Sequence, residues 1–278
     1  MSEIKERAAV LAGAALLACV GKPKFYIYAQ RRRGFFGRIA SAFCQGHAGR
    51  VGANYSIFMN DKDKERMTDI AMQYYSDDSL HGFADDDYSK RADGKPLLEQ
   101  QRGLILPLVV TAIDKDSPET VLEIGCGNGD AIAYLAKAYP NVKFIGVDLS
   151  VKVAEKKHSL PNLSFIKGYA LDLMREGLNA DLIYGSSTFC IFAPKELGHY
   201  MVALESAKRV IISEPVMPGF KHLPELQEES LHMDLYMWWH NYFGYLTYSG
   251  WTVETAETVN FAYRHNPNAK VFLINARH

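Results

Sequence analysis

Three glycines at alternate positions, Gly125, Gly127 and Gly129, lie between two acidic residues, Glu123 and Asp148. Glycines at this spacing let the backbone turn sharply and approach a ligand that a Cβ atom would exclude. A carboxylate that follows a second apolar run is suited to accept hydrogen bonds from the hydroxyl groups of a ribose. The pattern therefore predicts a site for a nucleotide-like ligand.

The segments around these residues predict the elements that position them. An apolar run over residues 120–124 indicates a buried strand, and the alanine-rich segment 130–139 indicates a helix that ends before Pro140. A second apolar run, over residues 142–147, predicts the next strand and leads directly into Asp148. Strand, glycine loop, helix, strand and acidic residue follow in the order of a nucleotide-binding βαβ unit.

The glycine spacing separates two kinds of cofactor. A dinucleotide site requires Gly-x-Gly-x-x-Gly, whose third glycine would fall at Asp130. The motif here is instead Leu122-Glu-Ile-Gly-Cys-Gly-Asn-Gly129, and an acidic prefix suits a ligand that carries an ammonium and a sulfonium group. This motif resembles the first motif of class I S-adenosylmethionine-dependent methyltransferases. The resemblance covers about residues 97–278 and implies S-adenosylmethionine as cofactor in a Rossmann-like α/β fold.

The resemblance also implies which residues contact the cofactor. They lie in the glycine loop with its acidic prefix, at the end of the second strand, and after the third and fourth strands. They are Glu123, Gly125, Cys126, Gly127, Asn128, Gly129, Asp148, Leu149, Tyr169, Ala170 and Ser186. Ligands of open α/β sheets bind beyond the carboxyl ends of the strands, where the strand order reverses, so these residues are expected in one crevice.

One segment departs from the family's pattern. Similar enzymes often carry Gly-Asp-Ala after the third strand, whereas this chain has Gly168-Tyr-Ala-Leu-Asp172. We expect Tyr169 to stack on the adenine ring and Ala170 to offer its backbone amide, with Asp172 as the alternative acid. Ahead of the first motif, Tyr75 and Tyr88 are candidates for a lid over the cofactor and the acceptor, and ordinary packing is their alternative role.

The rest of the chain predicts a seven-stranded, mostly parallel sheet that ends in an antiparallel hairpin. Apolar runs at 163–168, 180–185 and 209–215 indicate the third to fifth strands, and those at 250–255, 258–264 and 270–275 the last ones. A helix is predicted from Leu97 to about Ile113, with Pro107 bending it or splitting it in two.

Residues 216–248 are predicted to be an insertion that sets the acceptor specificity. Pro224 begins a predicted helix that continues through Phe243, with one apolar stripe formed by Leu235, Trp238, Trp239, Tyr242 and Leu246. Such a stripe is typical of core packing. The alternative is a pocket for an apolar or aromatic acceptor, with Tyr236, Trp239 and Tyr88 as candidate contacts.

Methyl transfer is an in-line displacement, so a base is needed only where the acceptor must lose a proton. The candidates are His222, His232 and His240, because imidazole titrates near neutral pH, and each also has a structural interpretation. Glu214 is an alternative acid. The histidine spacing matches no common metal motif, and no metal is expected.

Residues 1–95 are predicted to be an N-terminal helical cap or arm, and residues 96–278 the methyltransferase domain. The segment 7–60 contains lysines and arginines but no acidic residue. It is interpreted as a cap or dimer arm, or alternatively as a membrane-surface anchor or a patch for an anionic substrate. Its apolar run from Ala8 to Val20 is shorter than the roughly 20 residues of a spanning helix.

The composition is that of an ordinary globular protein, with 48% hydrophobic and 23% charged residues. The net charge of −1 argues against a nucleic-acid partner, and the 4 cysteines show no Cys-x-x-Cys pair, which favours a reducing compartment. We therefore expect a cytoplasmic methyltransferase for a small molecule with an apolar or aromatic body, with a homodimer as one assembly. The alternatives are methylation of a lipid by a peripheral membrane enzyme and a non-catalytic cofactor-binding subunit.

Overall fold

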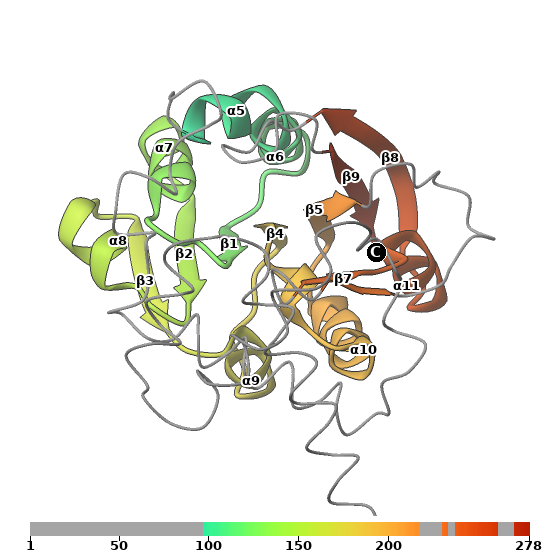
Figure 1. Cartoon of the computed structure of the whole chain (residues 1–278). Helices are drawn as coiled ribbons and strands as arrows, with labels where there is room; N and C mark the ends of the chain where they lie inside the picture. Colours follow the sequence, from blue (N-terminus) through green and yellow to red (C-terminus); the bar gives the residue numbers. More distant parts are fainter. Residues whose placement is uncertain (1–96, 217–229, 233–236, 261–269) are drawn as a thin grey trace, which may run out of the picture. The chain divides into compact units, whose positions relative to one another are not determined.

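The computed structural model of this chain describes residues 97–216, 230–232, 237–260 and 270–278 (Figure 1). The predicted cap, the lid residues Tyr75 and Tyr88, and the insertion residues His222 and Tyr236 lie outside this part. The chain divides into two compact units, residues 1–60 with 230–238 and residues 61–229 with 239–278. The predicted boundary between residues 95 and 96 stays a prediction.

Seven strands form the main sheet of the second unit. They are β1 (Thr120–Ile124), β2 (Lys143–Asp148), β3 (Leu163–Lys167), β4 (Leu182–Ser186), β5 (Arg209–Val216), β8 (Thr252–Asn260) and β9 (Lys270–Arg277). Their order is β3-β2-β1-β4-β5-β9-β8; β1 to β5 run parallel, and β9 is antiparallel to both of its neighbours. The predicted seven-stranded sheet with an antiparallel final hairpin is confirmed.

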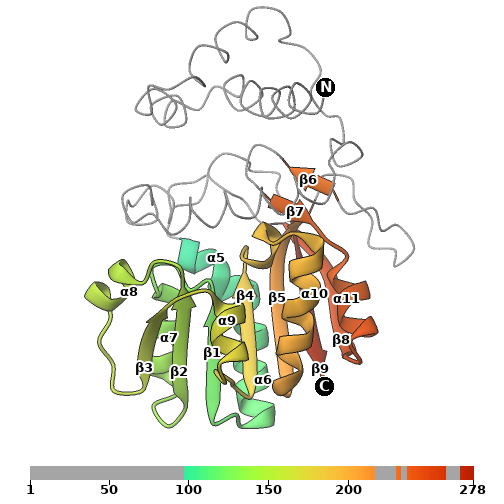
Figure 2. The ribbon, with the colours of Figure 1, turned by 90° about the horizontal axis from the view of Figure 1, so that it is seen from below.

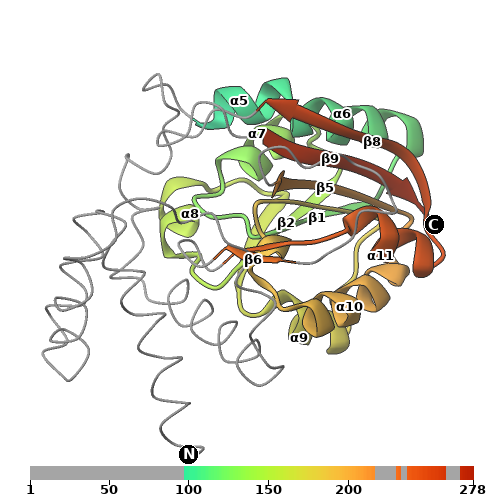
Figure 3. The same ribbon diagram turned by 45° about the vertical axis from the view of Figure 1, so that its right-hand side comes forward.

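Helices cover both faces of this sheet. The helical elements are α5 (Leu97–Gly103), α6 (Ile105–Asp116), α7 (Asp130–Ala138), α8 (Lys152–Lys157), α9 (Ala170–Arg175), η2 (Phe189–Ile191), α10 (Pro194–Ala203), η3 (Leu204–Ser206) and α11 (Tyr242–Tyr248). Figures 1 and 3 show α5, α6 and α7 on one face and α9, α10 and α11 on the other. None of the helices in the described ranges is long and apolar enough to cross a membrane.

The core lies between the sheet and these helices. Buried aliphatic and aromatic side chains of β1, β2, β4 and β5 meet those of α6 and α7; they include Val109, Val121, Ile132, Leu135, Phe144, Leu182 and Ile211. Strands that are covered on both faces read as continuous apolar runs, which is why the sequence predicts β1, β2 and β4 well. Figure 2 shows the parallel strands side by side with a helix layer on each side.

The helix predicted over residues 97–113 is split in two, as expected from Pro107. The break falls at Leu104, between α5 and α6. A proline ring clashes with the carbonyl group four residues earlier, and that group belongs to Gly103, the last residue of α5. Pro107 itself lies in the first turn of α6, where the missing N–H is not needed.

The prediction of one helix from Pro224 through Phe243 is wrong for the described residues of this segment. Two short strands, β6 (Ser230–His232) and β7 (Met237–Trp239), pair with each other there, and the helix α11 begins only at Tyr242. Asn241 defines that start, because its side-chain Oδ1 accepts the backbone N–H of Gly244 at 3.0 Å. Tryptophan also favours strands, so the apolar spacing alone did not separate the two states.

The last strands also differ from the prediction. Residues 250–255 and 258–264 were expected as two strands, whereas β8 runs without a break from Thr252 to Asn260. A register shift against β9 between Val253 and Thr255 marks a β-bulge. The bulge lies inside the first of the two expected strands, and residues 261–264 of the second lie outside the described part of the chain.

Candidate functional site

The loop between β1 and α7 contains three glycines with left-handed backbone conformations. Gly125, Gly127 and Gly129 have φ values of 74°, 52° and 74°. The backbone N–H groups of Gly125 and Cys126 donate to the carbonyl oxygen of Val147 at 2.8 and 3.1 Å. The loop is therefore fastened to the carboxyl end of β2, in a conformation that residues with a Cβ atom rarely adopt.

The three glycines differ in what surrounds them. A Cβ atom on Gly125 would lie 1.9 Å from Oγ1 of Thr188, and one on Gly129 would lie 2.8 Å from the ring of Phe165. At Gly127 no described atom lies within 4 Å of the added Cβ. The backbone of Gly127 is thus the part of the loop that a ligand can approach.

Asp148, the last residue of β2, lies beside this open glycine. Its Oδ2 accepts the backbone N–H of Gly127 at 2.8 Å, and its Oδ1 accepts that of Ser150 at 3.1 Å. Leu149 follows between them and is half-buried. The structure therefore brings together the glycine loop and the acidic residue that the sequence singles out.

A cluster of polar side chains forms hydrogen bonds and ion pairs at the start of α7. Asn128 donates from Nδ2 to Oδ2 of Asp130 at 3.0 Å and accepts the backbone N–H of Asp130 at 3.1 Å. Asp130 also pairs with Lys157 at 2.7 Å and with Nε2 of His158 at 2.9 Å, which connects α7 to the end of α8. Sequence reasoning missed this cluster, although an acidic residue in the first turn of a helix is a signal for such a role.

Glu123 lies inside the core rather than at the open surface. Its side chain is 3% exposed, and its partner in the register of β4 is Tyr184. Burial raises the pKa of Glu123 to about 8, and the nearby carboxylates of Asp148 and Asp130 act in the same direction. Glu123 is therefore mostly protonated at neutral pH, and its predicted contact with a cationic ligand stays a prediction.

The segment after β3 places Tyr169 in an aromatic cluster between α9 and α10. Its hydroxyl donates to Oε1 of Glu196 at 2.5 Å, and its ring makes edge contacts with Phe192 and Tyr200. These contacts already engage the side chain that was expected to stack on an adenine ring, so that role stays a prediction. Asp172 is an exposed side chain on α9, 3.4 Å from Arg175.

Ala170 begins α9, so its backbone N–H belongs to the first turn, which lacks partners within the helix. Its side chain is 4% exposed. The structure thus places Ala170 at the carboxyl edge of β3, as the sequence predicts, and its contact with a ligand stays a prediction.

The loop after β4 is held by a buried acid of β5. Ser186 ends β4, and the next residue, Ser187, has a left-handed φ of 55°. Glu214, which is fully buried, accepts the backbone N–H groups of Thr188 and Phe189 through Oε1 at 2.8 and 2.9 Å. Burial raises the pKa of Glu214 to about 7, while these hydrogen bonds act in the opposite direction.

Comparison with known proteins agrees with this geometry. The family model described as a methyltransferase domain matches residues 121–211, which run from β1 into β5 and include the glycine loop and Asp148. This stretch of the chain is thus similar to a methyltransferase domain.

Relatives with known names align with parts of this chain. A probable phthiotriol/phenolphthiotriol dimycocerosates methyltransferase 2 of Mycobacterium ulcerans is 31% identical over 105 residues, which are 36% of this chain and 39% of that protein. A fatty-acid O-methyltransferase of Mycolicibacterium smegmatis is 33% identical over 66 residues, 23% of this chain and 24% of that protein. Each alignment spans less than half of the relative's length.

A solved structure extends the likeness of the fold. The magnesium protoporphyrin IX methyltransferase from Synechocystis PCC 6803, with bound S-adenosylmethionine, superposes with a TM-score of 0.53 at 16% identity. The superposition covers 76% of this chain and 97% of that chain. At this identity it supports the Rossmann-like fold alone.

Of the three histidines proposed as bases, His240 is the one whose side chain lies in the described part of the chain. His240 is 7% exposed, its Nε2 lies 2.9 Å from the carbonyl oxygen of Phe192, and its ring contacts Tyr242 edge-on. These contacts favour its structural interpretation. The side chains of His232 in β6 and Trp239 in β7 lie outside the described residues. Within the described ranges, no group of three or more side chains is arranged to hold a metal ion.

Proposed function

We propose that this protein transfers the methyl group of S-adenosylmethionine to a small molecule with an apolar, lipid-like body. The observation that carries the proposal is the open backbone of Gly127 beside the carboxylate of Asp148. The match of residues 121–211 to the methyltransferase family supports it. The acceptor class is supported by the relatives, whose names refer to dimycocerosate lipids and to fatty acids.

The glycine loop and Asp148 suit this cofactor in shape and charge. A Cβ atom at Gly127 would enter the space beside the loop that the described residues leave open. Asp148 would accept hydrogen bonds from the ribose hydroxyl groups, and the backbone N–H of Ala170, the first residue of α9, would face the adenine ring. The bound cofactor would supply an electrophilic methyl group on a sulfonium.

The contribution of the protein to the reaction is mainly orientation. An in-line displacement is accelerated when the acceptor is held against the methyl group and water is excluded. A base is needed only for an acceptor that must lose a proton. The burial of His240 argues against this residue as the base. Location in the cytoplasm, a role of the basic N-terminal segment at a membrane surface, and a homodimer stay proposals.

The proposal is tested by titrating S-adenosylmethionine calorimetrically into the wild-type protein and into Asp148→Ala. Wild type is expected to bind, and the loss of a charged hydrogen-bond acceptor is expected to weaken binding by about tenfold or more. Glu155→Ala removes an exposed acid from the neighbouring helix α8 and serves as the control with unchanged affinity.

Activity is then measured as transfer of a radiolabelled methyl group to a panel of long-chain alcohols and fatty acids. Absence of binding by the wild-type protein would overturn the proposal. Binding without transfer to any acceptor would instead favour a cofactor-binding subunit.

A further inference from the structure

Glu214 satisfies all the backbone donors at the start of one short helix. Its Oε1 accepts the N–H groups of Thr188 and Phe189, and its Oε2 accepts that of Cys190 at 3.1 Å. The hydrogen bonds within η2 begin only with the N–H of Ile191, which donates to the carbonyl oxygen of Thr188. One carboxylate therefore accepts the three successive N–H groups that precede the first helical bond.

The path of the chain into this helix depends on such external support. Ser187 has a φ of 55°, which is unfavourable for a residue with a Cβ atom, and its N–H donates to the carbonyl oxygen of Ser213 at 2.8 Å. Ser213 directly precedes Glu214 on β5. Two neighbouring residues of β5 thus hold the loop after β4 in a conformation that the loop would not adopt by itself.

This loop in turn touches the glycine loop. The Thr188 side chain lies over the Cα atom of Gly125, so close that an added Cβ would be 1.9 Å from Oγ1 and 2.7 Å from Cγ2. Gly125 is the first of the three glycines, and its N–H fastens the loop to β2. The position of Thr188 therefore limits the positions that the glycine loop can take.

We propose that Glu214 is a positioning residue of the cofactor site, which holds Thr188 against Gly125 and so fixes the path of the glycine loop. The inference rests on the proposed function, because it assigns the role to the same S-adenosylmethionine site. This role differs from direct catalysis, because the Glu214 side chain is fully buried and both of its carboxylate oxygens accept backbone N–H groups.

The chain contains a matched control for the removal of such a carboxylate. Asp181 accepts the backbone N–H groups of Glu119 and Thr120 through Oδ2 at 2.8 and 3.1 Å. It lies at the amino ends of β1 and β4, on the edge of the sheet opposite to the glycine loop. Asp181→Asn and Glu214→Gln therefore make the same chemical change, from a carboxylate that accepts backbone N–H groups to an amide. Asp181 lies far from the glycine loop, whereas Glu214 lies next to the residues that contact it.

The decisive measurement is the dissociation constant of S-adenosylmethionine for wild type, Glu214→Gln and Asp181→Asn. The amide group that Glu214→Gln introduces would place an N–H donor against backbone donors. We expect about tenfold weaker binding, with faster hydrogen exchange at Thr188, Phe189 and Cys190. Asp181→Asn is expected to lower the unfolding midpoint without changing the dissociation constant.

The inference would be overturned if Glu214→Gln bound S-adenosylmethionine as tightly as the wild type. It would also be overturned if Asp181→Asn weakened binding as much as Glu214→Gln. A wild-type protein that does not bind at all would contradict the proposed function instead. If Glu214→Gln does not fold, Thr188→Ala provides the test, because it leaves the hydrogen bonds of Glu214 in place and removes the side chain over Gly125. The inference requires weaker binding there as well, and unchanged binding would overturn it.

Discussion

The carboxyl group of Glu123 shows how burial converts a common acid into a group that titrates near neutral pH. Its pKa in the folded protein is about 8, against 4.5 for the exposed side chain. The folded state therefore binds one more proton than the unfolded state between these two pH values. The stability from the protonated side chain is complete below pH 4.5 and is lost as the pH rises through 8.

We expect Glu123→Gln to reduce the pH dependence of stability. Between pH 6 and pH 8 the free energy of unfolding of the wild type should fall more steeply than that of Glu123→Gln, by up to about 1.4 kcal/mol per pH unit. The reason is that the glutamine side chain does not release a proton in this range. Urea unfolding at pH 6, 7 and 8 measures both slopes. The buried Glu214 titrates in both proteins, so the difference isolates Glu123. Parallel slopes would contradict this assignment.

Some residues of the site were predictable from the sequence, and others were not. The three glycines and Asp148 lie within one βαβ unit, where local spacing determines what is brought together. Thr188 and Glu214 belong to other strands, and their contacts with the loop depend on the order β1-β4-β5. Sequence spacing carries no information about such contacts, so the glycine loop was predicted while its support was missed.

The glycine loop allows a separation of folding from binding at the level of one element. Gly127→Ala meets no described atom, so we expect a loss of only about 1–2 kcal/mol from the left-handed φ, together with much weaker binding of S-adenosylmethionine. Gly125→Ala adds a clash with Thr188 and should destabilise the protein by clearly more. Thermal unfolding and calorimetry measure the two effects. Equal destabilisation by both substitutions would show that the difference in surroundings does not matter.

The elements themselves were predictable to different degrees. The parallel strands are buried on both faces, so their apolar runs stand out in the sequence. The segment 224–243 was expected as one helix, yet its described residues contain β6, β7 and only the start of α11. Its aromatic residues suit a strand as well as a helix, and the choice depends on pairing between β6 and β7 rather than on local preference.

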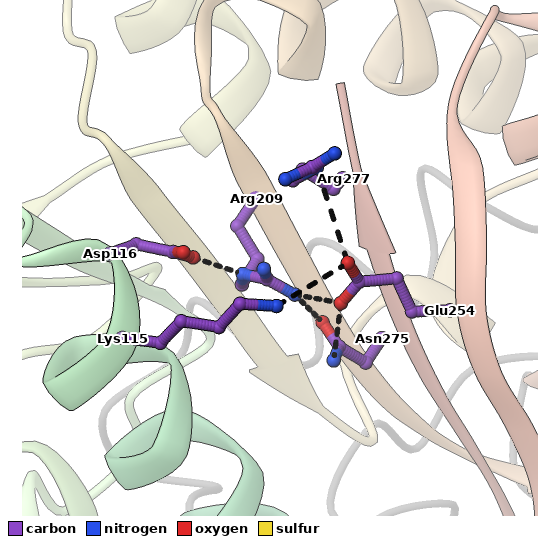
Figure 4. A network of polar contacts seen from close by, with 6 residues as sticks. All are labelled: Lys115, Asp116, Arg209, Glu254, Asn275 and Arg277. Atoms are coloured by element: carbon purple, nitrogen blue, oxygen red, sulfur yellow. Dashed lines mark hydrogen bonds and ion pairs between the residues drawn. The ribbon is translucent and has the colours of Figure 1, made fainter.

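Across the whole molecule, Arg209 connects elements that are distant in the sequence (Figure 4). It begins β5, its side chain is 2% exposed, and it pairs with Asp116 of α6 and Glu254 of β8 at 2.5 and 2.6 Å. It also donates to Oδ1 of Asn275 on β9 at 2.8 Å. Because β5 is parallel to β1, this network lies at the amino ends of the parallel strands, whereas the glycine loop lies at their carboxyl ends.

We expect Arg209→Ala to destabilise the protein by about 1.5–3 kcal/mol, since a buried side chain and its charged hydrogen bonds to Asp116 and Glu254 are lost. Lys208→Ala is the control: Lys208 pairs with Asp181 but is 74% exposed, so its removal should change the stability little. Urea unfolding measures both, and the dissociation constant of S-adenosylmethionine should stay unchanged in any folded fraction. A loss from Arg209→Ala no larger than that from Lys208→Ala would contradict a role of this network in stability.

The placement of β9 between β5 and β8 has a consequence for the order in which the sheet is assembled during translation. Until residues 270–277 have left the ribosome, β5 is an unpaired edge of the parallel sheet and β8 has no neighbour within it. The nascent protein therefore exposes two strand edges late in synthesis, a state that favours association with other chains. A chain shortened at residue 269 would remain in that state, and its expected fate is aggregation although the glycine loop and Asp148 are intact.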